Sequence, residues 1–223
     1  MRAVLFDVDG TLMSFEFDVQ GTRKAMIDTL SGMGMDVSGL ALSLPTQAIL
    51  GWARNQCGDG RAWEYSQVRA ALYSVLDGFE MESSAKARVL EGTKPALEAI
   101  GARSRLAVVT NSGRAAADKM LDRAGIRSLF EFVLTRDDVE EMKPGPAGLV
   151  KALGILQVSP SDAVYVGDSL LDILAGKAAG IRVISIATGL YSRERLKSEG
   201  AEFVLGSISE LPSVLSSMRG SSP

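Results

Sequence analysis

The chain has 223 residues, 46% of them hydrophobic, and a formal net charge of −3, so it can bury a core and gives no electrostatic reason to expect nucleic-acid binding. It contains no histidine, which excludes Ser-His-Asp hydrolases, Cys-His proteases, phosphohistidine enzymes and histidine-ligated zinc sites. The single cysteine, Cys57, cannot form an internal disulfide, and Trp63 stands where a cysteine-based phosphatase needs an arginine.

The first predicted element is a buried strand at Ala3–Phe6, and about 75 residues without a convincing strand follow it. The spacing of apolar residues in this stretch predicts helices at Gly21–Gly34, Thr46–Asn55 and Ala62–Leu76. A connection this long greatly exceeds the usual few residues plus one helix. We therefore expect an inserted helical subdomain at residues 15–88, between two parts of a core formed by residues 1–14 and 89–215.

Strands and helices alternate in the rest of the chain. Short apolar runs predict strands at Leu106–Val109, Phe132–Leu134, Ala163–Val166, Val183–Ile186 and Glu202–Leu205. Helices are predicted between them at Arg114–Ala124, Ala147–Leu156, Leu170–Ala179 and Ser192–Glu199. This alternation predicts the α/β class, with a doubly wound, Rossmann-like parallel sheet as the core. The serine, glycine and proline content of residues 216–223 predicts a disordered tail.

Carboxylates follow two of the predicted strands. Asp7 and Asp9 come after the first strand with Gly10 behind them, and Asp168 ends a later strand with Asp172 four residues on. Because the carboxyl ends of parallel strands meet at one edge of the sheet, we expect Asp7, Asp9 and Asp168 to converge there. Crowded carboxylates either bind protons or hold a cation. Oxygen ligands suit Mg²⁺, which pairs with phosphate.

Groups that suit an anion follow two other turns. Thr110 and Asn111 end a predicted strand just before a helix, where a hydroxyl and helix N–H groups can seat a phosphate. Lys143 lies beside Pro144 in a restricted turn and supplies positive charge. With the aspartates, these residues indicate metal-assisted phosphoryl transfer, and a carboxylate is the plausible nucleophile in a chain without histidine.

The order of these motifs resembles a known family. Asp7–Leu12, Thr110–Asn111, Lys143–Pro144 and Gly167–Asp172 look like the four ordered motifs of the haloacid dehalogenase superfamily. The resemblance extends from Met1 to about Leu211 and is greatest to the phosphoglycolate-phosphatase-like members, whose helical cap lies between the first two motifs. It implies that the insertion at residues 15–88 is such a cap, closing over the site and setting the substrate.

The resemblance also implies roles for the carboxylates. Asp7 would be the nucleophile, forming an aspartyl-phosphate, and would help to bind the metal. Asp9 would protonate the leaving oxygen and then activate water, while its backbone carbonyl ligates the metal. Asp168 would bind Mg²⁺, and Asp172 would support it directly or through water. Dehalogenating members lack an acid two positions after the nucleophile, so Asp9 favours a phosphatase or a phosphomutase.

The remaining motif residues would bind phosphate. The resemblance implies that Thr110 and the Asn111 amide hold phosphoryl oxygens, and that Lys143 balances the charge of Asp7 and the phosphate. Gly10 would let the backbone approach the phosphate. Candidate substrate contacts outside the motifs are Phe15, Phe17, Arg23, Gln47, Trp52, Arg54 and Arg114, each of which has an ordinary packing or surface alternative.

The function expected from the resemblance is a Mg²⁺-dependent phosphatase that hydrolyses a small phosphomonoester. Two alternatives stay open: a phosphomutase of the β-phosphoglucomutase type, and a non-catalytic protein that binds phosphate or metal. The partner would be a small phosphorylated metabolite, with no nucleic acid and no membrane, and the chain would be a monomer or a homodimer. A cytoplasmic location is expected, because no signal peptide or long apolar run is present.

Overall fold

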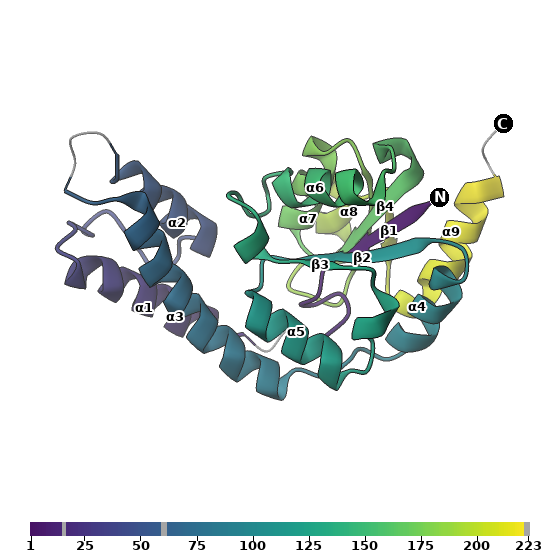
Figure 1. Cartoon of the computed structure of the whole chain (residues 1–223), viewed down its shortest axis with the longest axis horizontal. Coiled ribbons are helices and arrows are strands. Elements are labelled where there is room, and N and C mark those ends of the chain that lie inside the picture. Colours follow the sequence, from purple (N-terminus) through teal and green to yellow (C-terminus); the bar gives the residue numbers. More distant parts are fainter. Residues whose placement is uncertain (15–16, 59–61, 221–223) are drawn as a thin grey trace. The chain divides into compact units, whose positions relative to one another are not determined.

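The computed structural model describes residues 1–14, 17–58 and 62–220 (Figure 1). For residues 219 and 220 it describes the backbone only. The chain divides into two compact units. The first consists of Met1–Phe15 together with Lys86–Pro223, and the second is Glu16–Ala85. Among the described residues, no helix is long and apolar enough to span a membrane.

The first unit contains the parallel sheet that the alternating pattern predicted. Its strands are β1 (Ala3–Phe6), β2 (Arg105–Val109), β3 (Val133–Leu134), β4 (Ala163–Gly167), β5 (Arg182–Ile186) and β6 (Phe203–Leu205). They lie in the order β3-β2-β1-β4-β5-β6, and every pairing is parallel. The central strands are apolar on both faces because helices cover both faces of the sheet.

Helices form a layer on each side of this sheet (Figure 1). On one face, Val4 and Phe6 pack with residues of α4 (Thr93–Gly101), α5 (Arg114–Arg123) and α9 (Leu211–Gly220). On the other face, Ala3 and Leu5 pack with α6 (Ala147–Leu156) and α7 (Leu170–Ala178), while α8 (Arg193–Glu199) contributes Leu196 to a neighbouring cluster. Single turns of 3₁₀-helix lie at Arg127–Leu129, Arg136–Asp138, Pro160–Asp162 and Ile208–Glu210. The expected α/β architecture is therefore confirmed.

The C-terminal segment differs from the prediction of a disordered tail. Residues 216–220 continue helix α9, and only residues 221–223 lie outside the described part of the chain. Leu211, Leu215 and Met218 recur at helical spacing and are buried in the core. Their burial stabilises a helix whose other positions are mostly serine, glycine and proline, so composition alone was misleading here. Helix α4 was also not predicted individually.

The second unit consists of α1 (Val19–Gly32), α2 (Thr46–Asn55) and α3 (Tyr65–Lys86), the last of which ends in the first unit. Its buried side chains include Met26, Leu30, Ile49, Ala53 and Leu72. Asp18 caps α1 by accepting a hydrogen bond from the Gly21 N–H at 2.9 Å. Helix α3 continues past the predicted end at Leu76 as far as Lys86, and Gly78 lies inside it.

Candidate functional site

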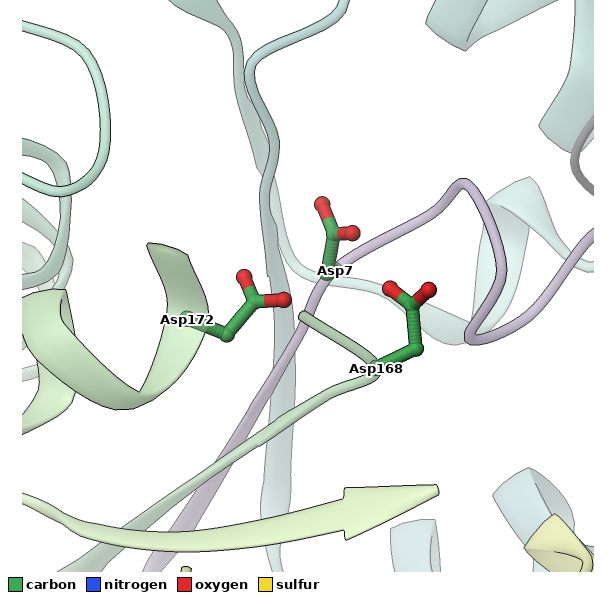
Figure 2. A group of neighbouring side chains, drawn as sticks. All are labelled: Asp7, Asp168 and Asp172. Atoms are coloured by element: carbon green, nitrogen blue, oxygen red, sulfur yellow. The ribbon is translucent and has the colours of Figure 1, made fainter. Parts of the chain in front are cut away.

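Three aspartates form a buried cluster at the carboxyl edge of the sheet. Asp7 follows β1, where its N–H donates to the Val166 carbonyl at 2.9 Å, Asp168 follows β4, and Asp172 lies in the first turn of α7. One carboxylate oxygen from each lies within 4.8 Å of the others. Figure 2 shows the three carboxylates converging from these separate elements. Their relative exposures are 7%, 7% and 0%, so very little water reaches them.

Lys143 is the cation that faces this cluster. Its ammonium lies 2.7 Å from Asp7 Oδ1, 2.6 Å from Asp172 Oδ1 and 2.7 Å from the Tyr165 hydroxyl. These three oxygens match the three N–H donors of a lysine. The structure therefore brings Lys143 beside Asp7, as the resemblance implied, and holds it there by a second carboxylate.

Tyr165 was not among the predicted site residues. Its ring is fully buried in β4, and its hydroxyl lies 2.9 Å from both the Val109 carbonyl and Asp172 Oδ1. A buried tyrosine normally finds a hydrogen-bond partner for its hydroxyl. A tyrosine inside an otherwise apolar strand was the one signal that could have identified it from the sequence.

Burial controls the electrostatics of the cluster. Desolvation, with smaller contributions from neighbouring carboxylates, raises the pKa of Asp7 to about 7 and that of Asp168 to about 8. Burial also opposes the charge of Asp172, yet Lys143, Ser169 and Tyr165 together lower its pKa. Desolvation lowers the pKa of Lys143, but Asp172 and Asp7 outweigh it and the net shift is upward. One buried ammonium thus faces three carboxylates, which leaves the cluster short of positive charge.

The cluster has the donor chemistry of a site for a hard cation. All of its ligand atoms are carboxylate oxygens, which suit Mg²⁺ rather than zinc or copper. Asp172 Oδ2 accepts hydrogen bonds from the Ser169 N–H and hydroxyl at 3.0 and 2.6 Å, so both Asp172 oxygens already have protein donors. Asp168 has a weaker contact, with the Thr11 hydroxyl at 3.5 Å. Asp7 and Asp168 are therefore the carboxylates best placed to hold a metal.

Two glycines leave space for the Asp168 carboxylate. A Cβ atom on Gly10 would lie 2.2 Å from Asp168 Oδ2, and Gly10 also has a φ of +76°. A Cβ atom on Gly189 would lie 1.7 Å from the same oxygen. The Thr188 hydroxyl, next in the chain to Gly189, donates to the Gly10 carbonyl. Gly10 was predicted from its motif, whereas Gly189 and Thr188 were not, because only the tertiary structure brings their loop to this edge.

Asn111 connects the loop after β2 to Lys143. The Asn111 side chain donates to the Lys143 carbonyl at 3.0 Å and accepts from the Lys143 N–H at 2.9 Å. In the same loop, the Thr110 hydroxyl accepts from the Ser112 N–H at 3.2 Å and lies 3.3 Å from the Ser112 hydroxyl. The Asn111 side chain therefore joins the two predicted anion-binding turns, the one after β2 and the one at Lys143, by two hydrogen bonds.

Asp9 was expected to converge with Asp7 and Asp168, but it is not among the three aspartates whose carboxylate oxygens lie within 4.8 Å of one another, although its charge still helps to raise the pKa of Asp7. Asp9 is half-buried, and its Oδ2 accepts a hydrogen bond from the Ser112 hydroxyl. The chain leaves the extended conformation after Asp7, since the Val8 carbonyl accepts from three successive N–H groups at residues 11–13. Strand alternation therefore no longer applies at Asp9, and Asp172 occupies the third position of the cluster.

The three arginines among the other candidate contacts have local partners. Arg114 donates to the Val133 carbonyl at 2.9 Å and pairs with Asp138, which accounts for its side chain within the first unit. In the second unit, Arg23 donates to the Leu42 carbonyl at 3.2 Å and Arg54 lies over the Tyr65 ring. Phe17, Gln47 and Trp52 are half-buried, and Phe15 lies outside the described residues.

The chain as a whole is similar to several known proteins. A model of the haloacid dehalogenase-like hydrolases matches residues 1–180. The chain is 31% identical to a phosphoglycolate phosphatase of Cupriavidus necator, covering 97% of this chain and 94% of that protein. It is 39% identical to pyrophosphatase PpaX of Anoxybacillus flavithermus over about half of each chain (50% and 52%). The crystal structure of CbbY from Rhodobacter sphaeroides with phosphate aligns with a TM-score of 0.63 and 29% identity, covering 95% of this chain and 96% of that one.

Proposed function

Because the chain belongs to the haloacid dehalogenase-like hydrolase family, we propose that it hydrolyses a small phosphomonoester through an aspartyl-phosphate on Asp7, with Mg²⁺ as cofactor. Its assignment as a phosphoric monoester hydrolase rests on the family and on relatives named as phosphatases. The observation that carries the mechanism is the buried group of Asp7, Asp168 and Asp172 around the Lys143 ammonium.

The nucleophile in this proposal is Asp7. One of its oxygens attacks phosphorus, and the bond from phosphorus to the ester oxygen breaks. Lys143, 2.7 Å from Asp7 Oδ1, balances negative charge as the carboxylate and the phosphoryl group approach. The Thr110 hydroxyl and the Asn111 amide would hold phosphoryl oxygens, and Gly10 would leave room for the phosphate. Asp172 acts in this scheme by holding the ammonium, since both of its oxygens have protein donors.

Asp9 would carry the proton. It protonates the departing ester oxygen, then removes a proton from the water that attacks the aspartyl-phosphate and releases inorganic phosphate. Its partial exposure supports this role, because solvent can reach this carboxylate while Asp7 stays buried. The Ser112 hydroxyl, which donates to Asp9 Oδ2, would fix the orientation of that carboxylate.

Mg²⁺ would be held by the carboxylates of Asp7 and Asp168, with the Asp9 carbonyl as a further ligand and with Asp172 in support. When bound, the ion would neutralise carboxylate and phosphate charge and stabilise the transferring group. The raised pKa values of Asp7 and Asp168 support this assignment, because they show that burial disfavours these carboxylates as anions until positive charge is added. Further, we propose that the unit Glu16–Ala85 is the cap that selects the substrate.

The proposal is tested by a phosphate-release screen with and without Mg²⁺. The panel contains phosphoglycolate and pyrophosphate, which the names of the two relatives suggest, with sugar phosphates and nucleotides. We expect Mg²⁺-dependent release of inorganic phosphate, and an isomerised sugar phosphate would instead indicate a phosphomutase. Asp7→Asn should lower kcat at least about a thousandfold with the fold retained, while Asp122→Asn on the exposed face of α5 serves as the matched control. Full turnover by Asp7→Asn would refute the mechanism.

A further inference from the structure

The largest fully buried side chain of the described residues is an arginine that the proposed reaction does not use. Arg136 lies in the 3₁₀ turn Arg136–Asp138 after β3, and its side chain is 0% exposed. A guanidinium stays charged in proteins, and burying that charge is costly unless specific contacts compensate. Asp137 Oδ1 lies 4.0 Å from Arg136 Nε, which is a long ion pair, and the other neighbours of Arg136 indicate what the buried charge is for.

Arg136 contacts two successive carbonyl groups of the loop after β2. Its Nη1 donates to the Asn111 carbonyl at 3.3 Å, and its backbone N–H donates to the Ser112 carbonyl at 3.4 Å. In a trans peptide the C=O and N–H groups point in opposite directions. Holding these carbonyls toward Arg136 thus turns the N–H groups of Ser112 and Gly113 to the other side of the loop, and the Ser112 N–H does meet the Thr110 hydroxyl there.

The rest of the turn holds the same loop. Asp137 Oδ2 accepts from the Arg114 N–H at 2.8 Å, and Asp138 pairs with the Arg114 guanidinium while it caps the turn at Thr135. All three residues of Arg136–Asp138 therefore contact residues 111–114. The loop is held on its other side by the two hydrogen bonds between Asn111 and Lys143.

We propose that Arg136 is a positioning residue for phosphate binding: through the Asn111 and Ser112 carbonyls it orients the loop that presents Thr110, and it adds a fixed positive charge behind that loop. This inference rests on the proposed function, because it assigns the loop to the phosphate. Ser112 extends the effect, since its hydroxyl donates to Asp9. Charge placed in a site with little water acts more strongly on a dianion than the same charge at the surface.

The test is direct binding of inorganic phosphate, measured by calorimetry in the presence of Mg²⁺ and well below the melting temperature of each variant. We expect Arg136→Met to raise the Kd for phosphate at least tenfold, and Arg136→Lys, which keeps the charge, to fall between Arg136→Met and the wild type. The matched control is Arg105→Met, which removes the salt bridge to Glu131 at the start of β2 and should leave the phosphate Kd unchanged. In kinetics, Arg136→Met should raise KM more than it lowers kcat.

The outcomes separate this inference from the proposed function. If the wild-type chain neither binds phosphate nor releases it from any substrate, the proposed function is wrong. If the wild type does both and Arg136→Met binds phosphate equally well, only the role of Arg136 is wrong, whatever the loss of melting temperature. Should Arg136→Met not fold, Arg136→Lys decides: a Kd raised threefold or more supports the role, and an unchanged Kd overturns it.

Discussion

Replacing Tyr165 by phenylalanine tests whether the buried hydrogen bonds around Lys143 hold the site together. The substitution removes one hydroxyl and keeps the ring that packs inside β4. Burial, followed by Asp172 and Asp7, raises the pKa of Tyr165 well above its usual value, so the hydroxyl keeps its proton throughout the working pH range. Without the hydroxyl, the Lys143 ammonium loses the oxygen that accepts its hydrogen bond at 2.7 Å. The Val109 carbonyl loses the O–H group that donates to it at 2.9 Å.

The expected destabilisation follows from these two contacts. A hydrogen bond to a charged group contributes about 1.5–3 kcal/mol, and a neutral one about 1 kcal/mol. Tyr165→Phe should therefore lower the free energy of unfolding by about 2.5–4 kcal/mol. For a chain of this size that corresponds to roughly 5–16 °C in Tm. Because Lys143 also loses one of its three anchors, kcat should fall about tenfold, with a smaller change in KM.

Urea unfolding followed by circular dichroism gives the stability, and phosphate release gives the kinetics. The matched control is Tyr191→Phe, a half-buried tyrosine packed against the cluster of Ile173 and Leu196, which should change stability by less than about 0.5 kcal/mol. If Tyr165→Phe changes both stability and kcat no more than the control does, the Tyr165 hydroxyl does not hold the Lys143 ammonium in place.

Three further predictions follow from the fold and the site. Gly189→Ala should displace the Asp168 carboxylate and raise the Mg²⁺ concentration for half-maximal activity at least tenfold. The control, Gly154→Ala in α6, adds a Cβ that meets nothing within 4 Å, so it should keep the wild-type Mg²⁺ concentration and gain up to about 1 kcal/mol of stability. Equal Mg²⁺ curves for the two variants would contradict the close approach of Gly189 to Asp168. In EDTA, the folded chain holds protons at Asp7 and Asp168, whose pKa values are raised to about 7 and 8, while the unfolded chain has released them, so stability should fall as the pH rises from 5 to 8. In melting scans, added Mg²⁺ should diminish this pH-dependent loss of stability. A melting temperature that rises between pH 5 and 8 in EDTA would contradict the prediction. Leu215→Ala should cost about 2–5 kcal/mol in urea unfolding if α9 is packed as described, against almost nothing for the exposed Ser213→Ala; a cost below about 0.5 kcal/mol would mean that this helix contributes little.

The sequence predicted the sheet well because its strands are nearly continuous apolar runs. Ala3–Phe6 and Ala163–Val166 are buried on both faces, so each nearly continuous apolar run marks a strand directly. Local composition was less reliable where packing opposed it. The serines after Leu215 suggested a disordered tail, yet the burial of Leu215 and Met218 keeps this segment helical.

The site was predictable only as far as motifs reach. The positions of Asp7, Asp168 and Lys143 follow from strand ends and short spacings, which the sequence shows. The place of Asp9 depends on how the chain turns at Val8. The alternation of side chains along a strand does not predict this turn. Tyr165 and Arg136 act through contacts with residues 22 and 25 positions away, Lys143 and Asn111, so a reading of local patterns had no means of pairing them.

The order of strands in the sheet has a consequence for synthesis of the chain. β1 lies at the centre, and Ala3 is paired with Arg105 on one side and with Ala163 on the other. At about 5–20 residues per second, β4 leaves the ribosome roughly ten to thirty seconds after β1. The second unit, whose internal contacts lie within Glu16–Ala85, is complete before either neighbour of β1 exists. The strand that precedes Asp7 is thus the first to be made, and one of its edges stays unpaired until β2 has been synthesised and the other until β4 has followed.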